Sequence, residues 1–137
     1  GQGFDKFEDL KKSNDILVSK EGLATYYQWM RTEFGFREEQ VKPYTFNAAP
    51  FLTNTRAVMQ GYLTSEPAKV EKAGVKPVVH LLADSGFDTY ATLIETRREL
   101  VEKRPQVVQC FVDGSAIGWY NYLYGDNKAA NAAIKKD

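Results

Sequence analysis

The residues best suited to chemistry lie in the heptapeptide GYLTSEP at positions 61–67. The apolar segment AVMQGYL runs there directly into two hydroxyls, a carboxylate and a proline. Glu66 follows Ser65 and precedes the proline, so it can lie in the first turn of a helix, where the helix dipole favours an acid. Such a cap requires neither Tyr62 nor Thr64. The heptapeptide therefore supports two interpretations, a helix cap and a ligand-binding surface.

The turn SKEGLAT, which begins at Ser19, is the second candidate. The backbone N–H groups of Gly22, Leu23 and Ala24 are predicted at a helix start, where unpaired N–H groups can hold an anion or the polar edge of a ligand. Lys20 adds a positive charge beside them. The alternative interpretation is that Ser19 and Gly22 only shape a strand-to-helix turn. One glycine is a weak signal, and both interpretations stay open.

The single histidine and the single cysteine limit the chemistry available to the chain. His80 lies among apolar residues in VVHLLA, which predicts a packed or hydrogen-bonded residue. Cys110 falls within a helical pattern, which predicts a small core residue. An internal disulfide or a thiolate metal cluster is excluded, and no P-loop, dinucleotide-binding fingerprint, metal motif or nucleophile elbow is found. We therefore expect no cofactor, no metal and no catalytic residue.

Strands and helices that alternate along the chain must position these residues. Apolar and β-rich segments predict strands at 16–19, 41–46 (at a sheet edge because of Pro43), 57–63, 77–83 and 90–96. Helices are predicted at 5–12, 23–34 and 65–73, after a Thr96–Glu99 capping box, from Pro105 onward and after Asp126. The helix at 23–34 carries an apolar stripe of Leu23, Tyr27, Met30 and Phe34. Gly35 and Gly74 are predicted to end the second and third of these helices. This alternation predicts an α/β three-layer sandwich with a mainly parallel sheet.

The bulk composition is that of one ordinary globular domain of 137 residues. Eighteen basic residues balance eighteen acidic ones, so no charge excess indicates nucleic acid or an anionic membrane as a partner. The opening residues GQGFDKFEDL show no charged and apolar regions of a secretion signal. In parallel sheets, ligands bind outside the carboxyl ends of the strands, near helix N-termini. Both candidate turns are predicted at such positions.

Four stretches carry a resemblance to a known family: VSKEGLATYYQW, AVMQGYLTSEPAKVEKAG, LLADSGFDTYATLIETRRELVEKRPQVVQCFVD and GWYNYLYGDNKAANAAIKKD. The chain resembles the solute-binding proteins of ABC importers, in the broad family for nitrate, sulfonate, taurine and thiamine-pyrimidine precursors. The resemblance covers nearly the whole chain, and the run GYLTSEP…EKAG…LLAD is its most specific part.

The resemblance implies one lobe of a type II periplasmic-binding-protein fold, in which two α/β lobes clamp the ligand. Family members are much longer, so it also implies that this chain is a fragment. Residues 1–96 would be the second lobe with its crossing strand, and residues 97–137 would be helices that normally pack on the first lobe. Without that lobe, residues 97–137 are expected to repack or to form an interface between molecules.

The resemblance also implies a role and a site. The role is that of a periplasmic, non-enzymatic component that captures a small polar solute and delivers it to the membrane subunits of an ABC importer. Glutamate and tyrosine side chains suit an aminopyrimidine, whereas a lysine and backbone N–H groups suit a sulfonate. A stand-alone ligand-sensing domain is a further alternative. Relatives that synthesise the thiamine pyrimidine use a histidine and a cysteine-rich iron motif. This chain has only one histidine and one cysteine, so such an enzyme is not expected. The implied ligand-binding residues are Lys20, Glu21, Gly22, Leu23, Ala24, Tyr62, Thr64, Glu66, Asp84 and Tyr90.

Overall fold

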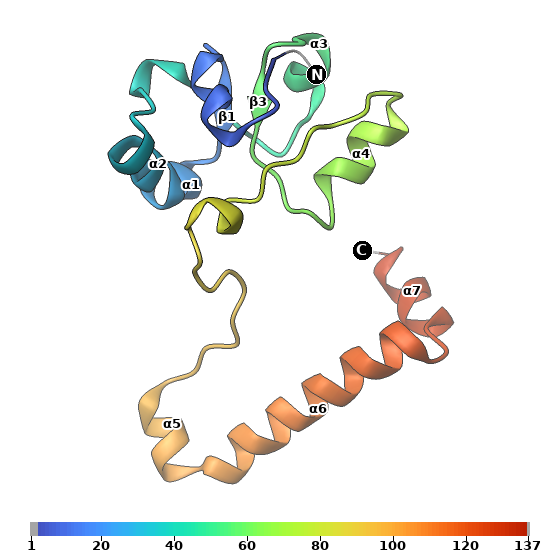
Figure 1. Ribbon diagram of the computed structural model, residues 1–137. Coiled ribbons are helices and arrows are strands. Elements are labelled where there is room, and N and C mark those ends of the chain that lie inside the picture. The colour runs from blue at the N-terminus through green and yellow to red at the C-terminus, as the bar shows by residue number, and fades with distance from the viewer. Residues whose placement is uncertain (1–2, 137) are drawn as a thin grey trace. The chain divides into compact units, whose positions relative to one another are not determined.

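The fold is described by a computed structural model for residues 3–136, and it divides into two units, one ending at Tyr90 and the other beginning at Ala91. The predicted domain boundaries at residues 1 and 137 lie outside the described residues. The first unit contains a parallel sheet of three strands, β1 (Ile16–Val18), β2 (Val41–Pro43) and β3 (Val58–Met59), in the order β2-β1-β3 (Figure 1). The predicted α/β class, the parallel sheet and the edge position of the second strand are confirmed.

Short helices connect or follow the strands of the first unit, and the described part of the second unit contains helices as its only regular elements, of which α6 is the longest. The helices of the first unit are α1 (Lys20–Ala24), α2 (Tyr26–Phe34), α3 (Ala49–Thr53) and α4 (Glu66–Lys72), with 3-10 turns at Phe7–Lys12, Glu38–Gln40 and Ala83–Ser85. The second unit contains α5 (Arg98–Lys103), α6 (Pro105–Tyr124) and α7 (Lys128–Ile134). In Figure 1, α1 and α2 lie on one side of the sheet and α3 and α4 on the other, which gives the first unit three layers.

The core of the first unit forms where the apolar stripe of α2 meets one face of the sheet. Tyr27 is fully buried, and Met30 is 4% exposed. Ile16 and Val18 belong to the same cluster, and Leu17, which alternates with them along β1, is also buried, so both faces of the strand are covered. The predicted stripe does face the core, but the helix predicted at 23–34 is interrupted at Thr25, so Leu23 lies on α1 and the rest of the stripe on α2. The predicted C-terminal glycine is confirmed: Gly35 ends α2 with φ of 71°.

Two predicted strands are wrong. Residues 77–83 are irregular until the 3-10 turn that begins at Ala83, and Val78 and Val79 are exposed rather than buried. Pro77 has no N–H to donate, and no described segment pairs with the outer edge of β3. Residues 90–96 are irregular and exposed as well, because a β-rich sequence becomes a strand only when a neighbour supplies hydrogen bonds.

The helix termini follow the predictions in part. Pro105 opens α6, and Gly74 follows α4 with φ of 81°. The Thr96–Glu99 capping box is wrong: α5 begins one residue later, with Arg97 at the cap position and no side-chain cap bond. Asp126 does accept a hydrogen bond from the Lys128 N–H at 3.1 Å, although the residue at the cap position of α7 is the following asparagine.

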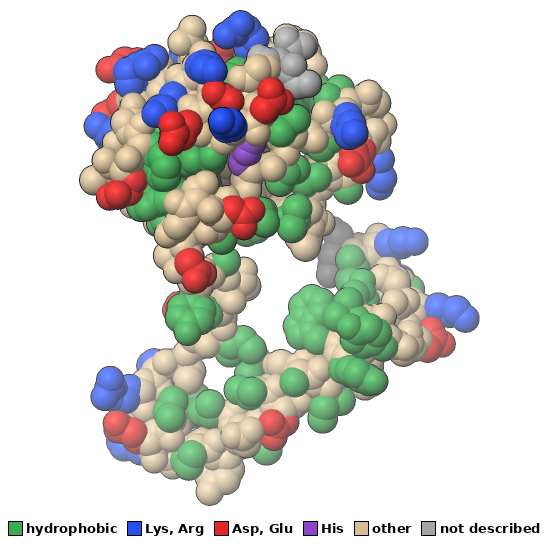
Figure 2. Space-filling view, in the orientation of Figure 1, with side chains coloured by type: hydrophobic (Ala, Val, Ile, Leu, Met, Phe, Trp, Pro, Cys, Tyr) green, Lys and Arg blue, Asp and Glu red, His purple; other side chains and the backbone are tan. Residues whose placement is uncertain are grey.

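The second unit has no buried residue in its described part. Figure 2 shows hydrophobic side chains spread along its surface, and the exposed aromatic cluster expected near the chain end is confirmed by Trp119, Tyr120 and Tyr124, each at least 65% exposed. Cys110, predicted to lie in a core, is exposed. The reason is that the helices α5 and α7 of the same unit are too short to cover α6, so most of its apolar residues stay exposed.

Candidate functional site

The two candidate turns follow neighbouring parallel strands, so both lie at the carboxyl edge of the sheet. The first follows β1, where the Ser19 side chain accepts a hydrogen bond from the Gly22 N–H at 3.1 Å and caps α1. The Leu23 N–H donates to the Ser19 carbonyl at 2.9 Å. Two of the N–H groups predicted to hold a ligand are therefore already engaged within the turn.

Gln60 ties the two turns together. It comes directly after β3, and its Oε1 accepts hydrogen bonds from the Ser19 N–H at 2.5 Å and from the Tyr26 hydroxyl at 2.6 Å. The donors come from the end of β1 and the start of α2, so one side-chain oxygen fixes the β1–α1 turn against the β3–α4 turn. Neither Gln60 nor Tyr26 was among the predicted site residues.

The Glu66 carboxylate holds the second turn from within. Its Oε2 accepts from the Tyr62 N–H at 2.7 Å, and the Glu66 N–H donates to the Tyr62 carbonyl at 3.2 Å. Its Oε1 lies 3.4 Å from each of the Tyr44 hydroxyl, the Ser65 hydroxyl and Lys69 Nζ. Glu66 is the first residue of α4 and only 6% exposed, whereas Ser65 makes no side-chain cap bond. The glutamate itself therefore closes the turn.

The electrostatics of this cluster are consistent with an ionised Glu66 beside neutral tyrosines. Burial works to raise the pKa of the Glu66 carboxyl, but the Tyr62 N–H and Lys69 outweigh it and the net shift is downward. Burial raises the pKa of Tyr44, and the neighbouring Glu66 charge raises it further. Burial also raises the pKa of Tyr26, with a further contribution from Tyr62, so the Tyr26 hydroxyl keeps its proton and donates to Gln60.

Two glycines make room for these contacts. A Cβ on Gly22 would lie 2.5 Å from the Tyr26 hydroxyl, and a Cβ on Gly61 would lie 2.7 Å from the Cβ of Glu66. Any larger residue at either position would therefore displace a side chain that closes or joins the two turns. Gly22 thus has a packing role, as the structural interpretation of its turn proposed.

The structure brings the predicted residues of the two turns to adjacent strand ends. Tyr62 is 63% exposed and Thr64 is also exposed, while Gly22 and Glu66 are buried. The exposed members of the first turn are Lys20, Glu21 and Ala24, and Leu23 is partly buried against the core. Asp84 lies in the 3-10 turn at 83–85, and Tyr90 ends the first unit at 87% exposure. Within the described chain, neither side chain forms a hydrogen bond with the other predicted residues.

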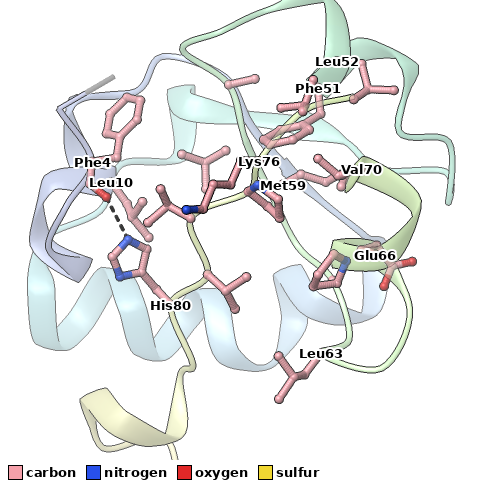
Figure 3. A pocket seen from close by; sticks show the side chains of 18 of the residues that line it. Phe4, Leu10, Phe51, Leu52, Met59, Leu63, Glu66, Val70, Lys76 and His80 are labelled. Atoms are coloured by element: carbon pink, nitrogen blue, oxygen red, sulfur yellow. Dashed lines mark hydrogen bonds between the residues drawn. The ribbon is translucent and has the colours of Figure 1, made fainter. Parts of the chain in front are cut away.

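A pocket of about 470 Å³ lies beside β3, on the side that carries α4 and residues 75–82 (Figure 3). Most of its lining is apolar, including Met59, Val70 and Leu81, and only Tyr62 and Glu66 of the predicted residues reach it. His80 lies on its wall and is hydrogen bonded through Nε2 to the Phe4 carbonyl at 2.8 Å, which confirms the structural interpretation of the histidine. The pocket is thus mainly the space along the unpaired edge of β3.

Among residues 3–136, no group of three or more His, Cys, Asp or Glu side chains is placed to hold a metal ion. None of the helices described there is both long enough and apolar enough to cross a membrane. The two strand ends carry the Gln60 amide, the exposed hydroxyl side chains of Tyr62 and Thr64, and Lys20. These groups can form hydrogen bonds with a small polar molecule.

The profile of the family described as NMT1/THI5 like matches residues 1–130. No curated protein and no solved structure matches the chain significantly.

Proposed function

Because the chain belongs to the NMT1/THI5-like family, we propose that it is the substrate-binding component of an ABC importer. The family supports a ligand-binding role of the periplasmic-binding type, and the proposal adds the importer, its membrane subunits as partners and the periplasm as the location. The solute we propose is small and polar, a pyrimidine-type thiamine precursor or a related amine. The chain binds it without chemistry, and closure of two lobes around it signals to the transporter.

The observation that carries this proposal is the junction of two turns at the carboxyl ends of β1 and β3. The turns are fixed to each other through Gln60, and Tyr62 is left exposed above the junction. A rigid pair of turns with an exposed aromatic ring and free polar groups suits a flat polar solute, because stacking and hydrogen bonding can act together.

Sulfonate, taurine or nitrate binding at the same junction is the alternative. It is favoured by Lys20, whose side chain is exposed at the start of α1. It is weakened by the Gly22 and Leu23 N–H groups, which donate to Ser19 instead of facing outward. The acid at position 21 beside Lys20 further reduces the local positive charge. The pyrimidine-type solute therefore remains our first proposal.

A thermal shift assay tests the proposal. The protein is heated with millimolar 4-aminopyrimidine, taurine, other sulfonates or nitrate, and a ligand at about 100 times its Kd should add about 2.7 kcal/mol to the free energy of unfolding. We expect 4-aminopyrimidine to raise the melting temperature most. If no member of the panel raises it, the transport role is contradicted. If taurine or nitrate raises it and the pyrimidine does not, the alternative solute class replaces the first.

A further inference from the structure

Two glutamines of the first unit differ in burial and in how many side-chain N–H donors they have engaged in hydrogen bonds. Gln40 is 1% exposed and fully engaged: its Oε1 accepts from the Arg37 N–H at 2.8 Å, and its Nε2 donates to the Lys11 carbonyl at 2.7 Å and to the Ser13 carbonyl. Gln60 uses only its oxygen, with the two donors described above. Gln40 is therefore a purely structural residue, whereas Gln60 keeps two N–H donors in reserve.

The orientation of the Gln60 amide follows from the chemistry of its partners. The Ser19 backbone N–H can only donate, so the amide atom that faces it must be the oxygen. The Tyr26 hydroxyl donates to the same oxygen, and its own proton is retained because burial raises the pKa of this phenol. A flipped amide would set an N–H against the Ser19 N–H. The Nε2 group is thus held in one direction by two hydrogen bonds on the other end of the amide.

The Nε2 group is open to solvent. Across residues 3–136, Gln60 Nε2 forms no hydrogen bond, and no buried side-chain nitrogen or oxygen lacks a partner. Gln60 is partly buried, and a buried Nε2 without a partner would be one of those atoms. Its Nε2 must therefore be accessible to water. Gln60 directly follows β3 at the carboxyl edge of the sheet.

We propose that Gln60 is a ligand-binding residue whose oriented Nε2 donates to a hydrogen-bond acceptor on the solute. The inference rests on the proposed function and specifies the chemistry that the site selects. The solute presents an acceptor, either a ring nitrogen or carbonyl of a heteroaromatic ring or a sulfonate oxygen, toward the ends of β1 and β3. Tyr62 supplies the neighbouring aromatic surface. Glu66, by contrast, is committed to its own turn and leaves the recognition of the solute to the amide.

The test is Gln60→Glu, which keeps an oxygen for Ser19 and Tyr26 and replaces the free NH2 group by a second oxygen. Isothermal titration with 4-aminopyrimidine and with taurine should show about a ten-fold or greater loss of affinity for whichever of them binds the unaltered protein. Gln28→Glu, on the exposed face of α2, adds the same charge nearby and should leave the affinity unchanged. Melting temperatures of both variants check that the fold is retained.

Aniline and side-chain NMR complete the experiment. Aniline keeps an aromatic ring and an amine but has no ring acceptor, so its affinity should be low and equal in the unaltered protein and in Gln60→Glu. In the 15N-labelled protein, the Gln60 side-chain NH2 resonances should shift on titration while those of Gln28 stay. If 4-aminopyrimidine or taurine binds both forms equally and the Gln60 resonances stay, this inference is wrong while the proposed function stands. If neither compound binds the unaltered protein, this inference fails, and the proposed function fails with it only when no other member of the thermal-shift panel binds.

Discussion

The two units of the chain differ in whether their apolar side chains are buried. The first unit packs its apolar side chains around a sheet of three short strands, with Tyr27 fully buried. The second unit places most of its apolar residues on α6, a helix of 20 residues whose only charged side chain is Asp113, and buries none of them. A helix with this many apolar residues is normally covered by other elements.

The difference shows what each kind of element needs in order to form. Every hydrogen bond of a helix is made within the helix itself, so α6 can be regular without a neighbour, although its exposed surface lacks the packing that usually stabilises helices. Strands need a partner for every ladder bond, so only three of the five predicted strands form. The first unit therefore holds the better-defined site, and the second offers an uncovered surface.

The largest contrast is expected from removing one aromatic side chain from each unit. Tyr27→Ala should lower the free energy of unfolding of the first unit by about 3–5 kcal/mol, because it opens a cavity and removes the hydrogen bond of the Tyr27 hydroxyl to the Arg37 carbonyl. Phe111→Ala, at a site 61% exposed, should change stability by less than about 0.5 kcal/mol. Urea unfolding followed by Trp29 fluorescence in a Trp119→Phe background measures the first effect, and far-ultraviolet circular dichroism measures the second. Equal losses of stability in the two variants would contradict the difference between the units.

Replacing a glycine by alanine should change stability in opposite directions in the two units. Gly61→Ala should destabilise the first unit by about 1–3 kcal/mol, since the new Cβ meets that of Glu66 at 2.7 Å. Gly114→Ala in α6 has nothing within 4 Å of the new Cβ and should stabilise the helix by about 0.5–1 kcal/mol. Urea unfolding and far-ultraviolet circular dichroism report the two effects. Neutral behaviour of Gly61→Ala would mean that the Glu66 turn adapts easily.

Much of the fold could be predicted because its signals are local. The stripe through Tyr27 and Met30, the left-handed glycine after α2 and the proline that opens α6 each depend on residues within a few positions of one another. The segments at 77–83 and 90–96 have strand-like sequences, yet a strand also requires a neighbour, and no property of the segment itself reveals whether one is present.

The site was predictable only in position. Strand ends and helix starts indicated the two turns, but the role of Gln60 depends on the register of β1 against β3, which places Leu17 opposite Met59. A polar residue in the middle of the apolar segment AVMQGYL, at position 60, is the available signal. Likewise, Glu66 was expected in the first helical turn, whereas the return of its carboxylate to the Tyr62 N–H required the three-dimensional path of the turn.

The two units should also differ in how a glutamate affects the pH dependence of stability. In the first unit, the ionised Glu66 is buried. Its pKa is lowered in the folded state, so its stabilising contribution is present above the unfolded value of 4.5 and is lost as the pH falls below that value toward the folded pKa. Glu66→Gln should therefore cost about 1–2 kcal/mol at neutral pH and flatten the decline in stability between about pH 6 and about pH 3. Urea unfolding across this range measures it.

The control for this prediction lies in the second unit. Glu99 forms an exposed pair with Lys103 at 2.7 Å, and Glu99→Gln should change stability by less than about 0.5 kcal/mol at any pH. An equal pH response of Glu66→Gln and the unaltered protein would show that the Tyr62 N–H does not favour the ionised carboxylate. In a Glu66→Ala variant, lower stability with unchanged affinity for 4-aminopyrimidine would assign Glu66 to the turn alone.

Trp119→Glu is expected to have the smallest effect on stability. It also tests most directly what the exposed apolar surface of α6 does. Trp119 is 65% exposed and packs only edge-on against Tyr122 at 6.0 Å between ring centroids, so folding of the first unit should change by less than about 0.5 kcal/mol. Association should change instead: we predict that the chain self-associates through residues 97–137, because molecules that share an apolar helix face can cover it mutually. Sedimentation velocity should show oligomers that grow with concentration and are weakened by the substitution. The exposed Tyr62→Glu, in the first unit, should leave them intact, and a monomer at all concentrations would mean that α6 is covered in another way.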